Sequence, residues 1–389
     1  MINYEFQNKT KIIFGRDMEN RVGTEVKQYS NNLMFVHYGD GIIEKLGLYD
    51  KVVKSLKEAG VDFVELTGIK PNPELGKVYE GIKICKEKNI GFVLAVGGGS
   101  VIDTAKAIAA GVPYDGDVWD YFENKAGIVK KALPIGVILT IPASGSETST
   151  GSVITKEEGR YKRFIDSWEL QPRFSILDPE ITLGIPPFLT ACGVVDIMSH
   201  TMEKYFTLTP NVDFIDRLSE ALFRSMINNG RKVMESPKDY NVRAEIMLAG
   251  SFSHNSYLDS GRVADWASHI IEHEISAIYG VTHAAGLTAI IPAWMKYVYK
   301  NGLTRFVQYA VRVWDVDIEF GSFEEIAFEG IRRTENFFKE LGLPTTLKEL
   351  KIDSSRFDEM ADKATENGKT GNFMKLGKED VINILNLAL

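Results

Sequence analysis

The first half of the chain alternates short apolar runs with longer amphipathic stretches. Helical patterns with one apolar face fill residues 74–89 and 101–111, and the second ends at Gly111. Five apolar runs of strand length surround them, at residues 32–39, 61–66, 90–96, 135–142 and 173–179. Strands that alternate with helices of this length are typical of βαβ units, so the pattern predicts a mostly parallel sheet.

This alternation stops at about residue 185. Runs rich in β-branched residues largely disappear there, and helical periodicity continues to residue 389. A chain of 389 residues is too long for one ordinary hydrophobic core and is suited to two domains. We therefore predict an α/β domain over residues 1–185 and an all-helical domain over residues 186–389, with the boundary between Gly184 and Pro187.

The net charge of −8 narrows the functional classes. An acidic chain is a poor match for a general nucleic-acid binder or a polybasic membrane anchor. Residues 1–11 lack the apolar core of a signal peptide, and the longest apolar run, residues 132–143, is too short to cross a bilayer. Cys85 and Cys192 are too distant in sequence for a CxxC pair. We expect a cytoplasmic protein that binds neither nucleic acid nor a membrane.

Two loops rich in small residues follow apolar strands. The first is Gly-Gly-Gly-Ser at 97–100, and it leads into a helix whose free N–H groups and dipole favour a phosphate. It is neither a GxGxxG nor a Walker A sequence. The second begins at Thr140 and offers four hydroxyl side chains, Ser144, Ser146, Thr148 and Ser149. Each loop alone is equally consistent with a plain turn or a helix cap, but two such loops at the carboxyl ends of strands in one sheet favour a dinucleotide.

Four of the six histidines fall into a pattern in the second half of the chain. Asp196 with His200, and His269 with His273, are each four residues apart and therefore share a helix face. His283 opens the next helical pattern. Three imidazoles and one carboxylate suffice to bind one Fe²⁺ or Zn²⁺ ion. Because five candidates exceed that requirement, we expect either His269 or His273 to face the site without binding the metal.

Residues typical of helix ends lie on both sides of the second pair, His269 and His273. Asp265 is a candidate N-cap and Gly280 a candidate stop for the helix that carries the pair. His37 and His254 fall in no comparable spacing. An isolated histidine is more often a hydrogen-bonded core or surface residue than a ligand, so these two stay outside the predicted site.

Several motifs in fixed order cover nearly the whole chain. They are KIIFG, PNPELGKVYEG, GGGSVIDTAKAIA, PASGSET, ILDPEIT, GVVDIMSHTMEKY, WASHIIEHEIS, THAAGL and PAWMKYVY. With them the chain resembles the iron-containing (group III) alcohol dehydrogenases, and within that family the butanol dehydrogenase and aldehyde reductase branch. The resemblance implies a dehydroquinate synthase-like fold. In this fold a Rossmann-like dinucleotide-binding domain precedes an all-helical metal-binding and substrate domain, with the metal in the cleft between them.

The resemblance also implies roles in the metal site. Asp196, His200, His269 and His283 match the four metal ligands of the family. His273 matches a histidine that lies beside the nicotinamide and the substrate without binding the metal. His273 is therefore a candidate catalytic residue that handles a proton or contacts the substrate.

Further matches fall on the cofactor site. Asp103 matches a residue near the nicotinamide and is the second candidate catalytic residue. Lys162 matches a recurrent lysine near the cofactor, with an exposed surface charge as the alternative explanation. The remaining matches are Gly97, Gly98, Gly99 and Ser100 at the pyrophosphate, and Thr140, Ser144 and Ser146 on the second loop.

One departure from the family pattern bears on the choice of cofactor. Relatives of this branch that use NADP read YGGGS after the first strand, whereas this chain reads YGDGIIEK. Gly39 and Gly41 remain, Asp40 replaces a glycine, Ile42 replaces the serine, and Glu44 stands where lysine is common. Two carboxylates repel a 2′-phosphate and accept hydrogen bonds from ribose hydroxyls, so among NAD(P)(H) cofactors the sequence favours NAD(H).

The implied activity is that of a metal-dependent, NAD(P)-linked alcohol dehydrogenase or aldehyde reductase. Its substrates are short- to medium-chain primary alcohols and aldehydes, and Fe²⁺ or Zn²⁺ acts as a Lewis acid during hydride transfer. Three alternatives stay open: a polyol dehydrogenase of the glycerol type, a non-redox metallohydrolase, and a non-catalytic sensor of nucleotide or metal.

The N-terminal segment predicts an assembly. Residues 4–15, YEFQNKTKIIFG, have the pattern of a strand or hairpin at a sheet edge, and exposed edges are usually covered or paired. In the family such strands pair across a twofold axis, so the resemblance implies a homodimer.

Overall fold

The computed structural model describes residues 1–39 and 41–389 and divides them into two compact units. The α/β unit consists of Gln7–Ile185 and Lys238–Ser251, and the helical unit consists of Met1–Phe6, Pro186–Pro237 and Phe252–Leu389. A single boundary at residue 185 therefore misplaces two short segments. The first six residues belong to the helical unit, and residues 238–251 belong to the α/β unit.

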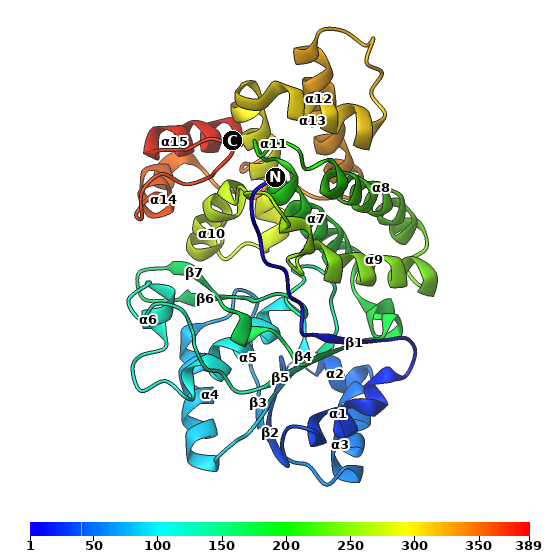
Figure 1. The fold of residues 1–389 in the computed structure, drawn as a ribbon, viewed down its shortest axis with the longest axis vertical. Coiled ribbons are helices and arrows are strands. Elements are labelled where there is room, and N and C mark those ends of the chain that lie inside the picture. The colour runs from blue at the N-terminus through cyan, green and yellow to red at the C-terminus, as the bar shows by residue number, and fades with distance from the viewer. Residues whose placement is uncertain (40) are drawn as a thin grey trace. The chain divides into compact units, whose positions relative to one another are not determined.

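The core of the α/β unit is a parallel sheet, as predicted (Figure 1). In the described part of the chain it has six strands in the order β1-β8-β5-β4-β2-β3. Every neighbouring pair is parallel. The strands are β1 (Lys11–Phe14), β2 (Asn32–Val36), β3 (Asp62–Leu66), β4 (Val93–Gly97), β5 (Ile135–Leu139) and β8 (Phe174–Leu177). The last five lie in the five apolar runs of the sequence, and β1 forms one edge of the sheet.

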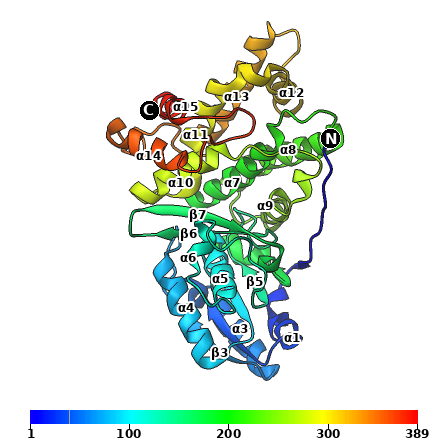
Figure 2. The same cartoon turned by 60° about the vertical axis from the view of Figure 1, so that its left-hand side comes forward.

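Helices cover both faces of this sheet (Figures 1 and 2). Helices α1 (Val22–Lys27) and α3 (Leu48–Glu58) bury apolar residues against one face, and α4 (Leu75–Lys88) and α5 (Gly99–Gly111) against the other. Alternate residues of each strand enter the two layers; in β2, for example, Phe35 faces α3 and Met34 faces α4. Both faces of a parallel sheet need such cover, which explains the nearly continuous apolar strands.

Smaller elements complete the α/β unit. An antiparallel hairpin joins β6 (Gly151–Lys156) to β7 (Tyr161–Asp166), and the sequence did not predict it. Short helices α2 (Ile42–Lys45) and α6 (Trp119–Phe122) follow β2 and α5. Most of α9 (Tyr240–Ser253) also belongs to this unit.

The rest of the described chain is helical, as predicted. Two of its helices, α12 and α13, run side by side (Figures 1 and 2). Within residues 1–39 and 41–389, no helix has both the length and the apolar character that crossing a membrane requires. The helices are α7 (Pro187–Tyr205), α8 (Asp213–Glu235), α10 (Ala267–Tyr279), α11 (His283–Val298), α12 (Leu303–Trp314), α13 (Phe323–Glu340), α14 (Phe357–Ala364) and α15 (Lys378–Leu387).

Candidate functional site

Helix α7 carries the first two predicted metal ligands. It begins at Pro187, and proline is well tolerated in the first turn of a helix. Asp196 and His200 lie one turn apart on it, and both are buried. The Nδ1 atom of His200 lies 2.9 Å from the backbone oxygen of Asp196. The other ring nitrogen, Nε2, therefore remains for a ligand.

The other predicted histidines lie on α10 and α11. Helix α10 ends at Tyr279 and is followed by the predicted stop Gly280, whose φ of +67° suits glycine; α11 begins at His283, as predicted. The predicted N-cap of α10 is wrong by one residue. Trp266 occupies that position, and Asp265 precedes it and accepts a hydrogen bond of 3.2 Å from Ala267 N.

The structure brings the four predicted ligands together within the helical unit. Ligand atoms of Asp196, His200 and His269 all lie within 4.8 Å of one another. His283 Nε2 lies 3.9 Å from Asp196 Oδ1. His283 also forms a second group, within the same limit, with Glu272 and His273. The site therefore gathers one carboxylate and three imidazoles, with His273 next to His283.

The donor atoms fit a divalent transition metal. His269 Nε2 is buried, and it has no hydrogen-bond partner within the described part of the chain. Burial, then the neighbouring His254, His269 and Lys204, lowers the pKa of His200 well below its usual value. A neutral imidazole is the form that binds a metal, and one oxygen with three nitrogens suits Fe²⁺ or Zn²⁺.

The two predicted cofactor loops meet in the α/β unit. A Cβ atom on Gly99 would lie 2.6 Å from Ser144 Oγ, so only glycine leaves this space between the loops. Gly98 N donates to Tyr38 Oη at 3.2 Å, and Thr140 N donates to Gly97 O at 3.0 Å. The carboxyl ends of β2, β4 and β5 therefore converge on a cradle at the N-terminus of α5, which fits a pyrophosphate.

Asp103 and Ser146 connect the two loops directly. Ser146 Oγ donates to Asp103 Oδ1 at 2.6 Å, and Val153 N donates to Oδ2 at 3.0 Å. Burial raises the pKa of Asp103, whereas Lys106, Ser146 and Val153 lower it. Both carboxylate oxygens are thus engaged by the second loop and β6; the predicted contact of Asp103 with the nicotinamide stays a prediction.

The remaining predicted cofactor residues lie at separate places in the α/β unit. Lys162, on β7, is buried rather than exposed, and it donates to Asn72 Oδ1 at 3.0 Å. Ser100 is half-buried in the first turn of α5. Gly39 has a φ of +77°, and Asp40 lies outside the described residues.

Two family models cover the sequence. The model of iron-containing alcohol dehydrogenases matches residues 9–179, and the C-terminal model of the same family matches residues 190–389. The chain belongs to the iron-containing alcohol dehydrogenase family.

Relatives of this family member match it over nearly its whole length. It is 44% identical to a probable NADH-dependent butanol dehydrogenase 1 of Bacillus subtilis, over 100% of both chains. It is 35% identical to the NADPH-dependent aldehyde reductase YqhD of Escherichia coli, over 95% of each. The crystal structure of NADH-dependent butanol dehydrogenase A from Thermotoga maritima superposes on this chain with a TM-score of 0.95. The two sequences are 38% identical, and the match covers 100% of this chain and 99% of that one.

In this family member, His254 borders the predicted histidines, contrary to the expectation that it lies outside the site, and so does Trp266. The ring centroid of His254 lies 4.4 Å from that of His200, and Trp266 lies 5.3 Å from His269. His254 lies just beyond the end of α9 and has no sequence partner at helical spacing, so only the tertiary structure could reveal it.

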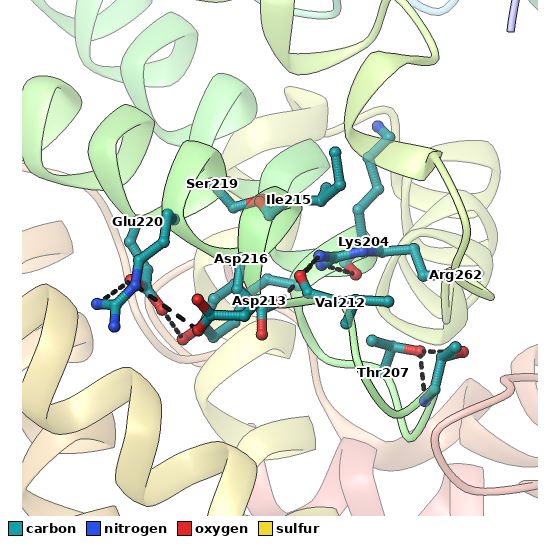
Figure 3. Close-up of polar contacts among 12 residues, drawn as sticks. Lys204, Thr207, Val212, Asp213, Ile215, Asp216, Ser219, Glu220 and Arg262 are labelled. Carbon is teal, nitrogen blue, oxygen red and sulfur yellow. Dashed lines mark hydrogen bonds and ion pairs between the residues drawn. The ribbon is translucent and has the colours of Figure 1, made fainter. Parts of the chain in front are cut away.

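Buried charges hold the segment that carries these rings (Figure 3). Arg262 donates to the backbone oxygens of Lys204 and Val212 at 3.0 and 3.2 Å, and to Asp216 Oδ1 at 2.8 Å. Lys204 Nζ donates to His200 O at 3.2 Å and to Ser253 O at 2.9 Å. The segment before α10 is therefore tied to α7 and α8 by charge-assisted hydrogen bonds.

A buried lysine likewise ties backbone segments together beside the cofactor loops. Lys106 Nζ donates to the backbone oxygens of Ser149 and Gly151 at 2.9 and 2.8 Å. Burial lowers the pKa of Lys106 to about 8, against the opposing effect of Asp103. Lys106 lies one helical turn after Asp103 on α5, and this spacing was the only hint of its role in the sequence. A lysine on a helix is usually exposed, so the sequence did not indicate that Lys106 is buried.

Proposed function

We propose that this chain is a metal-dependent, NAD(P)-linked alcohol dehydrogenase that interconverts primary alcohols of short to medium length with their aldehydes. The observation that carries the proposal is the convergence of Asp196, His200, His269 and His283 in a member of this family. Full-length relatives named butanol dehydrogenase and aldehyde reductase support the substrate class.

Different residues of the chain would bind the metal, contact the substrate and bind the cofactor. Asp196, His200, His269 and His283 would hold Fe²⁺, with Zn²⁺ as the alternative. When bound, the metal ion would act as a Lewis acid on the substrate oxygen, and the nicotinamide of NAD(P) would give or accept the hydride. His273 contacts the substrate or passes its proton, and the helix end at Gly99 binds the pyrophosphate.

We further propose NADH as the preferred cofactor. Relatives that are 44% and 40% identical are named NADH-dependent, whereas YqhD, at 35%, is named NADPH-dependent. The carboxylates of Asp40 and Glu44 would disfavour a 2′-phosphate. We also propose a cytoplasmic homodimer.

The test is a steady-state screen on full-length protein of measured metal content. Butanal and longer aldehydes are offered with NADH and NADPH, before and after metal removal by a chelator and after reloading with Fe²⁺ or Zn²⁺. We expect aldehyde reduction that disappears with the metal and returns on reloading. Faster turnover of glycerol than of butanol with NAD⁺ would favour a polyol dehydrogenase, and ester hydrolysis without nucleotide binding would favour a metallohydrolase.

A further inference from the structure

We propose that two buried glutamates, Glu203 and Glu272, are positioning residues that orient His269 and His283 toward the metal. The inference rests on the proposed function, because it assumes that these histidines bind the ion. Neither glutamate was a predicted site residue.

Glu203 holds His269 in place. Glu203 lies on α7, three residues after His200, and is 4% exposed. Its Oε1 atom lies 2.7 Å from His269 Nδ1 and also accepts a hydrogen bond of 3.1 Å from His269 N. A carboxylate can only accept, so Nδ1 carries the proton and Nε2 keeps its lone pair. That Nε2 is the buried nitrogen without a hydrogen-bond partner in the described chain.

Glu272 holds His283 in the same way, through the Nδ1 atom of the ring. Glu272 is 0% exposed, and its Oε2 atom contacts His283 Nδ1. The opposite nitrogen of the ring, Nε2, lies 3.9 Å from Asp196 Oδ1 and so faces the metal site. Gly286 leaves room for this carboxylate, since a Cβ atom there would lie 2.6 Å from Glu272 Oε1.

The same arrangement recurs at the third histidine with a different acceptor. His200 Nδ1 lies 2.9 Å from the backbone oxygen of Asp196. All three predicted imidazole ligands therefore have an oxygen acceptor at Nδ1, and Nε2 is the ring nitrogen on the side away from that acceptor. Such acceptors fix the tautomer and ring orientation and make the ligand nitrogen more basic.

A purely structural role is the competing explanation. Glu203 also accepts from Trp266 N at 2.7 Å, and so it holds the first turn of α10. Glu272 also contacts Ser276 Oγ on its own helix, and it lies in one group with His273 and His283. Each glutamate therefore has contacts besides its histidine, and the two give independent tests because they lie on different helices and face different imidazoles.

The experiment measures metal affinity rather than activity. Full-length wild type and Glu272→Gln, Glu272→Ala and Glu203→Gln variants are stripped of metal and titrated with Zn²⁺ against a chromophoric chelator. We expect Kd to rise by about 10-fold for the glutamine variants and toward 100-fold for Glu272→Ala. The ligand-field absorption of the Co²⁺-loaded protein should shift in each variant, because the imidazoles are less firmly oriented.

Glu220→Gln is the matched control. Glu220 is also a buried carboxylate of the helical unit, 4% exposed, and it accepts from Tyr205 Oη at 3.0 Å and Arg312 at 3.2 Å. This variant should lose thermal stability without a change in Zn²⁺ affinity or in the Co²⁺ spectrum.

The outcomes separate this inference from the proposed function. A wild type that binds neither Zn²⁺ nor Co²⁺ would overturn the metal site itself. A wild type that binds both, with unchanged affinity and spectrum in all three glutamate variants, would overturn the positioning role alone. If Glu272→Ala does not fold, the two glutamine variants decide, because they preserve side-chain size.

Discussion

His269 and His273 lie one turn apart on the same helix but in different surroundings. His269 is fixed by Glu203 and keeps a buried Nε2, whereas the ring centroid of His273 lies 5.6 Å from that of His283. We expect His269→Ala to lose the bound metal together with activity. His273→Ala should keep the metal and lose rate, because the proposed role of His273 is to contact the substrate or pass its proton and not to bind the ion.

Metal content by mass spectrometry and aldehyde reduction, measured on the same samples, check this division. His37→Ala is the control for metal content, since His37 is a buried histidine of the α/β unit, beside Glu65, and its loss should leave the bound metal unchanged. Loss of metal from His273→Ala as complete as from His269→Ala would show that the two roles are assigned wrongly.

Asp40 carries the prediction about cofactor preference. The double variant Asp40→Gly, Ile42→Ser removes a negative charge and adds a hydroxyl near the expected 2′-position of the ribose. The preference should move toward NADPH by about 1–3 kcal/mol, or roughly one to two orders of magnitude in the ratio of kcat/KM values. A wild type that already prefers NADPH would mean that other groups hold the phosphate.

The residues of the site that are easiest to predict are those whose partners lie one helical turn away. Asp196 and His200 signal their shared face through spacing alone. Glu203 and Glu272 have similar spacing from histidines, but a helical glutamate usually faces solvent, so nothing local indicates that these two are buried. Their partners come from other helices or from across a turn, and only the fold supplies them.

At the scale of elements, Gly99 is where α5 and the second loop approach each other. Gly99→Ala would place a Cβ atom 2.6 Å from Ser144 Oγ, so either that side chain or one of the two loops must shift. We expect the Kd for NADH to rise about tenfold, equivalent to ~1.4 kcal/mol, because the cradle for the pyrophosphate is filled. Isothermal titration with NADH measures the effect.

A second variant distinguishes two effects of the alanine, the close contact with Ser144 and the filling of the space for the pyrophosphate. In Gly99→Ala, Ser144→Ala the clashing oxygen is gone, and the next atom, Ser144 Cβ, lies at a tolerable 3.4 Å. Thermal stability should therefore recover while NADH binding stays weak. Recovery of full NADH affinity would show that the glycine matters only for packing between the loops.

The elements that the sequence predicted are those with an unmistakable pattern. Strand β4 is apolar throughout because helices cover both of its faces, and it was predicted within a few residues. Strands β6 and β7 form a hairpin in which charged residues such as Lys156 and Arg163 interrupt the apolar ones. A half-buried hairpin of this kind lacks the continuous run that identifies a central strand, and it was missed.

For the whole molecule, the edge strand β1 bears on assembly. Ile13 is buried, but Ile12 and Phe14 are 39% and 38% exposed on a strand that pairs only with β8 within the described chain. We expect a second copy to cover this edge. Light scattering should give a mass of twice 43.5 kDa at micromolar concentration.

A charge at the edge tests the position of that interface. Ile12→Lys should shift the mass toward the monomer, because a lysine there hinders pairing. Ile128→Lys is the control, since Ile128 is 72% exposed in a loop far from β1 in sequence. A monomeric wild type, or equal effects of the two substitutions, would contradict the prediction.

The division of the chain into interleaved segments constrains how this enzyme can be recombined with its relatives. The chain passes from one unit to the other at 6/7, 185/186, 237/238 and 251/252. Ser251 Oγ donates to the buried Glu147 Oε1 at 2.7 Å, although the two residues lie on opposite sides of residue 185. A chimera with one crossover at residue 185 would therefore separate this pair between two parents. To transplant cofactor specificity between homologues, residues 238–251 must be exchanged together with residues 7–185.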